Sequence, residues 1–393
     1  MIQIKPNNID AIVALHWEAI ETVSSNRLNF CIAFFEAATR KKYLPVAITK
    51  VETKFGVHYL SAIAIVKKIQ SNYSKNHSTK NKPVNQKSIL SFLNKQDTSL
   101  VHSLSNRKLE FNFCMSYLQH IQTNLEEIIT GKPLDLKRIK EDIQKNFTQY
   151  PIVTKTLMEF VFPYETFSND GFSTTTGNWN NYSLTKNLGV QVCPYCNRSW
   201  INTVTEGKTK TDVINPQLDH FYSQVDFPYF RLSFYNLIPS CEACNGRLKH
   251  GIEFDDTYLH PYIEGYGADG KIRTIAINVQ SSIGLDSAFL VHLLMQNKSL
   301  SPVIAGKIEK NHKLFEIDKI YEAHGEIISE IYRKKYISSD KYLEMLSKQF
   351  PALSKDRAEL YRIGFGNFYN EADFNKRPFA KLTKDVAEQV GLI

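Results

Sequence analysis

The chain has 393 residues, and 42% of them are hydrophobic, which is enough apolar material for a sizeable core in roughly two or three folding units. The 48 Lys and Arg residues against 40 Asp and Glu give a net charge of +8, which fits a nucleic-acid ligand but is also common in other proteins. The longest apolar runs, such as residues 60–66, are far shorter than the roughly 20 residues that a membrane-spanning helix needs. Polar residues near the N-terminus also argue against a signal peptide, so we expect a cytoplasmic protein without a membrane partner.

The first part of the chain has a helical pattern. From residue 8 to about residue 162, apolar residues recur mostly at spacings of three and four, which predicts a helical N-terminal region over residues 1–163. Cys31 and Cys114 stand alone in apolar surroundings there and are expected in the core. Residues 67–95 hold seven lysines and no acidic residue, which predicts a basic loop that is either solvated or in contact with phosphates.

The residue composition changes twice in the middle of the chain. Residues 164–188 are rich in Asn, Ser, Thr and Gly and offer too little apolar surface to order an element, so we expect a linker and a domain boundary over residues 164–192. Next, two β-branched runs at residues 200–205 and 211–214 flank a Glu-Gly-Lys turn and predict a β-hairpin. A short helix should follow over residues 241–250.

The last third of the chain returns to a helical pattern. We expect a helical C-terminal region over residues 263–393, in which the clearest helices cover residues 286–296, 310–335 and 339–349. The predicted fold class is therefore mainly α with a small α+β insert between two helical regions.

Four of the six cysteines form two Cys-x-x-Cys pairs, Cys193/Cys196 and Cys241/Cys244. Two pairs with the same internal spacing offer Zn²⁺ four thiolates, the closed tetrahedral ligand set of a structural site. A module of roughly 60 residues is marginally stable alone, and structural zinc can add on the order of 10 kcal/mol of folding free energy. The pattern favours a four-cysteine zinc site over disulfides, and buried thiols without a metal are the alternative.

The segment between the two cysteine pairs holds further motifs. They are LDHFY at residues 218–222, YNLIPS at residues 235–240 and CNGRLK at residues 244–249. In this order they resemble the HNH endonuclease superfamily. The resemblance covers about residues 192–262 and implies a ββα-metal module at residues 193–262. In that fold a hairpin presents Asp-His on its second strand, a loop follows, and the first turn of a helix faces the Asp-His across a metal ion.

The resemblance assigns chemical roles to four residues. His220, whose ordinary pKa near 6.5 suits proton transfer at neutral pH, is the general base. Asp219 is a Mg²⁺ ligand, and because neighbouring side chains of a strand point to opposite faces, both can serve one site only if the strand bends or ends there. Asn236 is the middle Asn that pins the loop by hydrogen bonds. Asn245 takes the place of the last His, and its carboxamide oxygen is a hard ligand suited to Mg²⁺ or Mn²⁺.

Three further polar residues follow Asn245 in the predicted helix. Arg247, Lys249 and His250 could contact phosphate, with Lys249 the strongest candidate, although a charged helix surface is usually only solvated.

The chain is similar to the PtuB-like HNH nucleases of bacterial anti-phage systems, which are associated with Septu and with retrons. The similarity lies in the sequence segments CPYCNR, LDHFY and FPYFRLSFYNLIPSCEACN. This likeness implies a PtuA-like ATPase partner. The chain departs from that subfamily at Ser223 and Gln224, where its members often have Pro-Lys.

The resemblance thus predicts a metal-dependent endonuclease that hydrolyses DNA phosphodiester bonds and leaves 5′-phosphate and 3′-hydroxyl ends. RNA is an alternative substrate. A second alternative is a zinc-knuckle binding module that performs no chemistry, because residues 193–250 are nearly neutral, with six basic and five acidic side chains.

Overall fold

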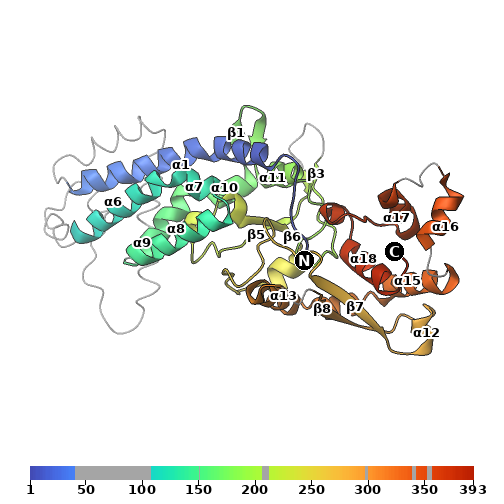
Figure 1. Ribbon diagram of the computed structural model, residues 1–393. Coiled ribbons are helices and arrows are strands. Elements are labelled where there is room, and N and C mark those ends of the chain that lie inside the picture. Colours follow the sequence, from blue (N-terminus) through green and yellow to red (C-terminus); the bar gives the residue numbers. More distant parts are fainter. Residues whose placement is uncertain (40–107, 150, 206–211, 297–299, 339–341, 352–355) are drawn as a thin grey trace. The chain divides into compact units, whose positions relative to one another are not determined.

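The computed structural model describes residues 1–39, 108–149, 151–205, 212–296, 300–338, 342–351 and 356–393 (Figure 1). They fall into two compact units, which we describe separately. Unit 1 comprises the described parts of Met1–Ile9, Asn181–Phe221 and Ile238–Ile393, and unit 2 those of Asp10–Asn180 and Tyr222–Leu237. The predicted basic loop at residues 67–95 lies outside the described residues. Within the described part of the chain, no helix combines the length and apolar character that crossing a membrane requires.

Unit 2 is built from helices and one small hairpin, as the helical pattern of the N-terminal region predicts. The elements are α1 (Ile9–Thr39), α6 (Lys108–Thr123), α7 (Leu125–Thr130), α8 (Pro133–Asn146), α9 (Pro151–Val161), α10 (Tyr164–Asn169), β1 (Phe172–Thr174), β2 (Gly177–Trp179), and the 3-10 turns η1 (Pro228–Phe230) and η2 (Phe234–Asn236). Cys31 and Cys114 are both buried in this unit, which confirms the prediction that they are core residues.

Helix α8 illustrates how the local sequence sets these elements. Pro133 occupies its first turn, where its missing N–H costs nothing, and the Asp135 carboxylate accepts a hydrogen bond from the Lys132 backbone N–H at 3.0 Å. Leu136, Ile139 and Ile143, spaced by three and four residues, are all buried. The apolar face of α8 therefore belongs to the core of unit 2.

A buried histidine lies in the core of unit 2. His16 is fully buried, and its Nδ1 accepts a hydrogen bond from the Trp179 indole N–H at 3.0 Å. Because an indole can only donate, the ring proton resides on Nε2, which donates to the Leu232 carbonyl at 2.8 Å. Burial lowers the pKa of His16 from 6.5 to about 4, so the ring stays neutral at neutral pH.

The structure corrects the expectation that residues 164–192 form a linker without elements. This segment contains α10, the β1–β2 hairpin and α11 (Asn181–Leu188), and the boundary between the two units falls inside it, after Asn180. Phe167, Phe172 and Trp179 are buried. The segment is mostly polar, but these three large aromatic side chains bury enough apolar surface to order it.

Unit 1 combines short sheets with helices. The strands pair as two-stranded sheets: β3 (Val204–Thr205) with β4 (Asp212–Ile214), β5 (Gln217–His220) with β6 (Leu237–Ser240), and β7 (Gly270–Ala276) with β8 (Phe289–Met295). The helices are α11, η3 (Ala243–Leu248), α12 (Val279–Ser282), α13 (Pro302–Leu314), α14 (Ile317–Glu322), α15 (Gly325–Ser338), α16 (Tyr342–Gln349), α17 (Arg357–Phe365), η6 (Glu371–Lys376) and α18 (Ala380–Gln389). The predicted hairpin corresponds to β3–β4 and the predicted short helix to η3.

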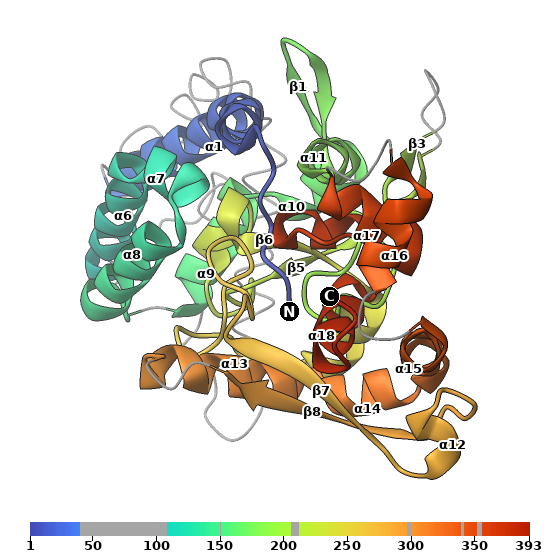
Figure 2. The same ribbon diagram turned by 45° about the vertical axis from the view of Figure 1, so that its right-hand side comes forward.

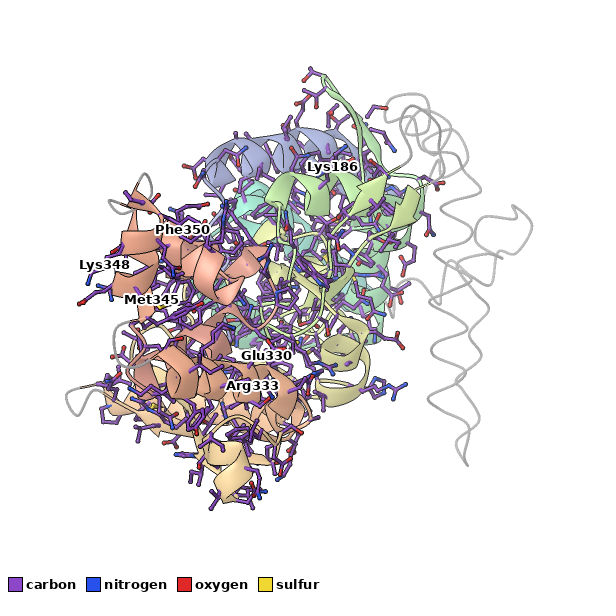
Figure 3. All side chains as sticks on the ribbon, turned by 90° about the vertical axis from the view of Figure 1, so that its right-hand side faces the viewer. Lys186, Glu330, Arg333, Met345, Lys348 and Phe350 are labelled. Carbon is purple, nitrogen blue, oxygen red and sulfur yellow. The ribbon has the colours of Figure 1, made fainter. Side chains whose placement is uncertain are left out.

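Two details of the C-terminal region differ from the sequence-based expectation. Residues 286–296 contain strand β8 rather than a helix, and β8 pairs antiparallel with β7 (Figure 2). Helix α14 contacts β8, and α18 contacts β7. The helix expected over residues 310–335 is divided into parts of α13, α14 and α15. Arg333 of α15 (Figure 3) donates two hydrogen bonds, at 2.9 and 2.7 Å, to the Gly284 carbonyl in the connection between β7 and β8.

Candidate functional site

Four thiols gather in unit 1, as the two Cys-x-x-Cys pairs predict. The Sγ atoms of Cys193, Cys196, Cys241 and Cys244 all lie within 4.8 Å of one another, and all four residues are buried. Cys196 Sγ and Cys241 Sγ are 4.0 Å apart, and none of the four forms a disulfide. Zinc–sulfur bonds of about 2.3 Å in a tetrahedron place sulfur atoms about 3.8 Å apart, so this cluster has the size of a four-coordinate metal site.

The first pair lies on a tight turn. Asn197 N donates to the Cys193 carbonyl at 2.8 Å, and Arg198 N donates to Cys196 Sγ at 3.4 Å. Asn197 has a φ of +50°, a left-handed conformation that Asn tolerates better than most residues. The turn thereby directs both thiols and one backbone N–H toward the centre of the cluster.

The C-terminal part of unit 1 holds this turn by hydrogen bonds. Asn197 Nδ2 donates to the Phe374 carbonyl at 2.9 Å, and Asn197 Oδ1 accepts from Lys381 N at 3.1 Å. The hydroxyl of Tyr321 donates to the Cys196 carbonyl at 2.7 Å. The cysteine cluster is consequently part of the packing of unit 1 and not a separate knuckle.

The thiols influence one another electrostatically. Burial raises the pKa of Cys193, whereas hydrogen bonds from Cys193 and the other thiols hold the pKa of Cys196 well below its ordinary value. Hydrogen bonding with Cys193 lowers the pKa of Cys241 to about 7. Hydrogen bonds with the other three thiols raise the pKa of Cys244. Thiolate is the form that binds metal, so a bound cation would favour deprotonation of all four cysteines.

The second pair follows strand β6 directly. Strand β5 ends at His220 and pairs with β6, and the chain then enters Cys241 and η3, which carries Cys244 and Asn245. The Asp-His dipeptide therefore lies at the end of a strand, as a shared site for both side chains requires. In contrast to the expected arrangement, Asp219 and His220 are not on the second strand of the β3–β4 hairpin but on β5.

A buried ion pair occupies the end of β5. The Lys249 ammonium donates to Asp219 Oδ1 at 2.7 Å and to Oδ2 at 2.8 Å, and both side chains are almost completely buried. It also donates to the His220 carbonyl at 2.6 Å. The Tyr195 hydroxyl donates to Asp219 Oδ2 at 2.5 Å. Tyr195 stands between Cys193 and Cys196, so one side chain joins the cysteine turn to the Asp-His strand.

Burial dominates the titration of this pair. It raises the pKa of Asp219 and lowers the pKa of Lys249, and in each case the charge of the partner opposes the shift. Burial and the nearby Asp219 charge raise the pKa of Tyr195 well above its usual value, so the phenol remains a hydrogen-bond donor. Removing either member of the ion pair would leave a buried charge without compensation.

The other predicted residues are distributed around this pair. His220 is buried, with 7% of its surface exposed. Asn245 is half-buried on η3, and its amide nitrogen donates to Gln217 Oε1 on β5 at 3.0 Å, so its oxygen is the atom that could ligate a cation. Arg247 and His250 are exposed. Lys249, by contrast, is turned inward onto Asp219 and does not lie on the surface as a phosphate ligand would.

Asn236 belongs to unit 2, where it is completely buried. Its Oδ1 accepts from Tyr222 N at 2.7 Å, and its Nδ2 donates to the carbonyls of Tyr222 and Phe230 at 3.1 and 3.0 Å. These bonds close the segment that follows His220 and Phe221 in the chain. Asn236 therefore has a loop-pinning geometry.

Sequence reasoning did not single out Tyr195 or the roles of Asn197 and Lys249 as internal hydrogen-bonding residues. The position of Tyr195 between the two cysteines of the first pair was a usable signal, because a side chain there is held close to the cluster. Comparisons with protein-family models, with curated proteins and with solved structures give no match for this chain. The assignment of a function therefore depends on the site.

Proposed function

We propose that this chain is a metal-dependent endonuclease of the HNH type, stabilised by one structural Zn²⁺ on its four clustered cysteines. The observation that carries the proposal is the order and contact of the parts: Asp219 and His220 end a strand whose partner strand leads into the second cysteine pair and a short helix with Asn245. The hydrogen bond from Tyr195 to Asp219 connects this arrangement to the first cysteine pair. Two paired strands and a helix are the parts that the HNH resemblance implies, with the difference that Asp219 and His220 lie on the first strand of the pair and not on the second.

Zinc is the metal that best fits the cysteine cluster. Four sulfur ligands in a closed set of tetrahedral size favour Zn²⁺ over hard cations such as Mg²⁺. Because Asn197 and Cys196 are bonded to Phe374, Lys381 and Tyr321, zinc would stabilise the C-terminal helices together with the turn.

Each residue of the site has a separate role in the proposed reaction. His220 takes the proton of the attacking water, and Asn236 pins the following loop, which restricts the end of the strand on which the base lies. Asp219 and Asn245 supply the carboxylate and carboxamide oxygens that would hold Mg²⁺ or Mn²⁺. When bound, such a cation neutralises charge on the phosphate and on the leaving oxygen. Carboxylate and carboxamide oxygens suit a hard cation, but a cation at Asp219 has to displace the Lys249 ammonium that occupies the carboxylate.

The same ion pair favours a second candidate function. A carboxylate that is satisfied by Lys249 and Tyr195 suits a non-catalytic zinc module that binds nucleic acid or protein. Such a module would keep the fold and show no cleavage.

An incubation of the zinc-loaded full chain with supercoiled plasmid, single-stranded DNA and RNA separates these functions. Parallel samples contain Mg²⁺, Mn²⁺ or EDTA. The nuclease proposal expects cation-dependent cleavage of DNA, and cleavage of RNA alone would assign the same chemistry to an RNase. Binding without cleavage of any substrate would support the non-catalytic module.

The resemblance to PtuB-like nucleases extends the proposal to a partner. We propose that the chain acts as an anti-phage effector together with a PtuA-like ATPase. The incubation should therefore be repeated with a PtuA-like ATPase, and a dependence of cleavage on ATP would support the partnership.

A further inference from the structure

The Lys249 ammonium is fully coordinated inside unit 1. Its three donors meet three acceptors: the two carboxylate oxygens of Asp219 and the carbonyl oxygen of His220. The ring of Phe254 covers it, with Nζ 4.4 Å from the ring centroid. Phe254 is stacked on Tyr258, with ring centroids 4.2 Å apart, and makes a T-shaped contact with Phe221 at 5.3 Å. No donor of Lys249 remains for a phosphate.

Asp219 is nearly saturated by the same contacts. A carboxylate offers about four lone-pair positions, and Lys249 and Tyr195 take three of them. A divalent cation on the remaining position would lie close to the ammonium, and like charges at this range in a buried site repel strongly. The resemblance-based role of Asp219 as a cation ligand therefore conflicts with the pairing of Asp219 in the structure.

We propose that Lys249 is the resident cation of this site and competes with the divalent cation for Asp219. The biological role of this competition rests on the proposed nuclease function, whereas its test measures only Mn²⁺ binding and needs no cleavage. Lys249 holds the carboxylate and the end of β5 in place without a metal, and it keeps the affinity of the free chain for Mg²⁺ or Mn²⁺ low. It is a positioning residue that sets how much cation the site requires, and not a phosphate ligand.

The competition is measured directly by Mn²⁺ titration of the zinc-loaded full chain, with free Mn²⁺ followed by electron paramagnetic resonance. Lys249→Gln removes the charge but retains a donor for Asp219, and we expect Mn²⁺ to bind about 10- to 100-fold more tightly than in the wild type. Lys249→Arg keeps the charge and serves as the matched control, with affinity close to that of the wild type. Adding Asp219→Asn to Lys249→Gln should abolish the gain. An unchanged affinity in folded Lys249→Gln would overturn the proposal.

Zinc content and melting temperature establish that each variant is folded. If Lys249→Gln does not fold, the wild type and Asp219→Asn decide the question. The proposal expects both to bind Mn²⁺ weakly and alike, since Asp219 is not available in the wild type. Tight Mn²⁺ binding by the wild type that is lost in Asp219→Asn would contradict it.

A DNA-binding measurement separates this role from phosphate contact. By fluorescence anisotropy in EDTA, Lys249→Gln should bind a labelled oligonucleotide as the wild type does, whereas a phosphate ligand would lose affinity and leave Mn²⁺ binding unchanged. The Mn²⁺ result is independent of cleavage. A chain that cleaves no substrate but shows the Mn²⁺ gain would refute the nuclease proposal and retain the competition.

Discussion

Replacement of Asn236 by Ala tests the loop-pinning hydrogen bonds. The change removes one acceptor from the buried Tyr222 N–H and one donor each from the buried carbonyls of Tyr222 and Phe230. A buried N–H without a partner costs about 1–3 kcal/mol, and a carbonyl, which has two lone pairs, costs less. We expect the free energy of unfolding of unit 2 to fall by about 2–4 kcal/mol.

The natural fluorophores make this loss measurable. Trp17 and Trp179 belong to unit 2, and Trp179 is buried, whereas Trp200 of unit 1 is 55% exposed and should change its emission little on unfolding. Urea unfolding followed by tryptophan fluorescence therefore reports mainly on unit 2.

The matched control is Asn146→Ala. Asn146 lies exposed on α8 and bonds only to Asp142 among the described residues, so its replacement should change the free energy of unfolding by less than about 0.5 kcal/mol. If Asn236→Ala unfolds with the wild-type midpoint and slope, the hydrogen bonds of Asn236 do not stabilise the loop as we argue.

Two further predictions concern zinc and pH. Elemental analysis should find about one Zn²⁺ per chain; Cys193→Ser and Cys241→Ser should lose the metal and unfold unit 1, whereas Cys114→Ser should retain the metal. A zinc-free, natively folded chain would exclude structural zinc. For pH, burial lowers the pKa of His16 from 6.5 to about 4, so the unfolded chain binds a proton that the folded chain does not in this interval. The neutral, buried His16 therefore makes its full contribution to the free energy of unfolding above pH 6.5. That contribution falls by about 3 kcal/mol as the pH decreases to about 4. Urea unfolding across this interval should show a steeper loss for the wild type than for His16→Gln, and equal slopes would exclude His16 as the cause.

The sequence predicts the cysteine cluster well because the ligand spacing is local and the chemistry of thiols is specific. It places Asp219 and His220 on a strand and requires that strand to bend or end there if both side chains serve one site, and β5 does end at His220. The partnership of Lys249 with Asp219 could not be anticipated, because the two residues are distant in the chain and a lysine at that position also suits phosphate contact. Inward rotation of Lys249 depends on the aromatic group around Phe254, which only the fold assembles.

The errors in the fold prediction have similar causes. A short apolar run such as residues 289–295 is compatible with a helix or a strand, and pairing with β7 decides in favour of a strand. The helix expected over residues 310–335 is interrupted at Glu316, which adopts a left-handed conformation with a φ of +46°, and again before Gly325, where α15 begins and where a Cβ would lie 1.9 Å from the Ser287 carbonyl oxygen. Neither constraint is visible in the periodicity of apolar residues.

Asn245→Ala distinguishes a cation ligand from a base. The variant loses one oxygen ligand that water can replace, so its cleavage rate should fall at low Mg²⁺ and recover in part as Mg²⁺ or Mn²⁺ is raised. A rate that stays low throughout the titration would argue against a ligand role for Asn245.

The most direct test of the proposed function is the cleavage rate of His220→Ala relative to the wild type on the preferred nucleic-acid substrate, across a Mg²⁺ series. His292→Ala, which alters a histidine on β8 outside the site, is the matched control and should cleave at the wild-type rate. Removal of the base should lower the rate of His220→Ala at least about 10²-fold at every Mg²⁺ concentration. Unchanged zinc content and a cooperative melting transition above the assay temperature establish that the variant is folded. A folded His220→Ala chain that cleaves as fast as the wild type would contradict the mechanism.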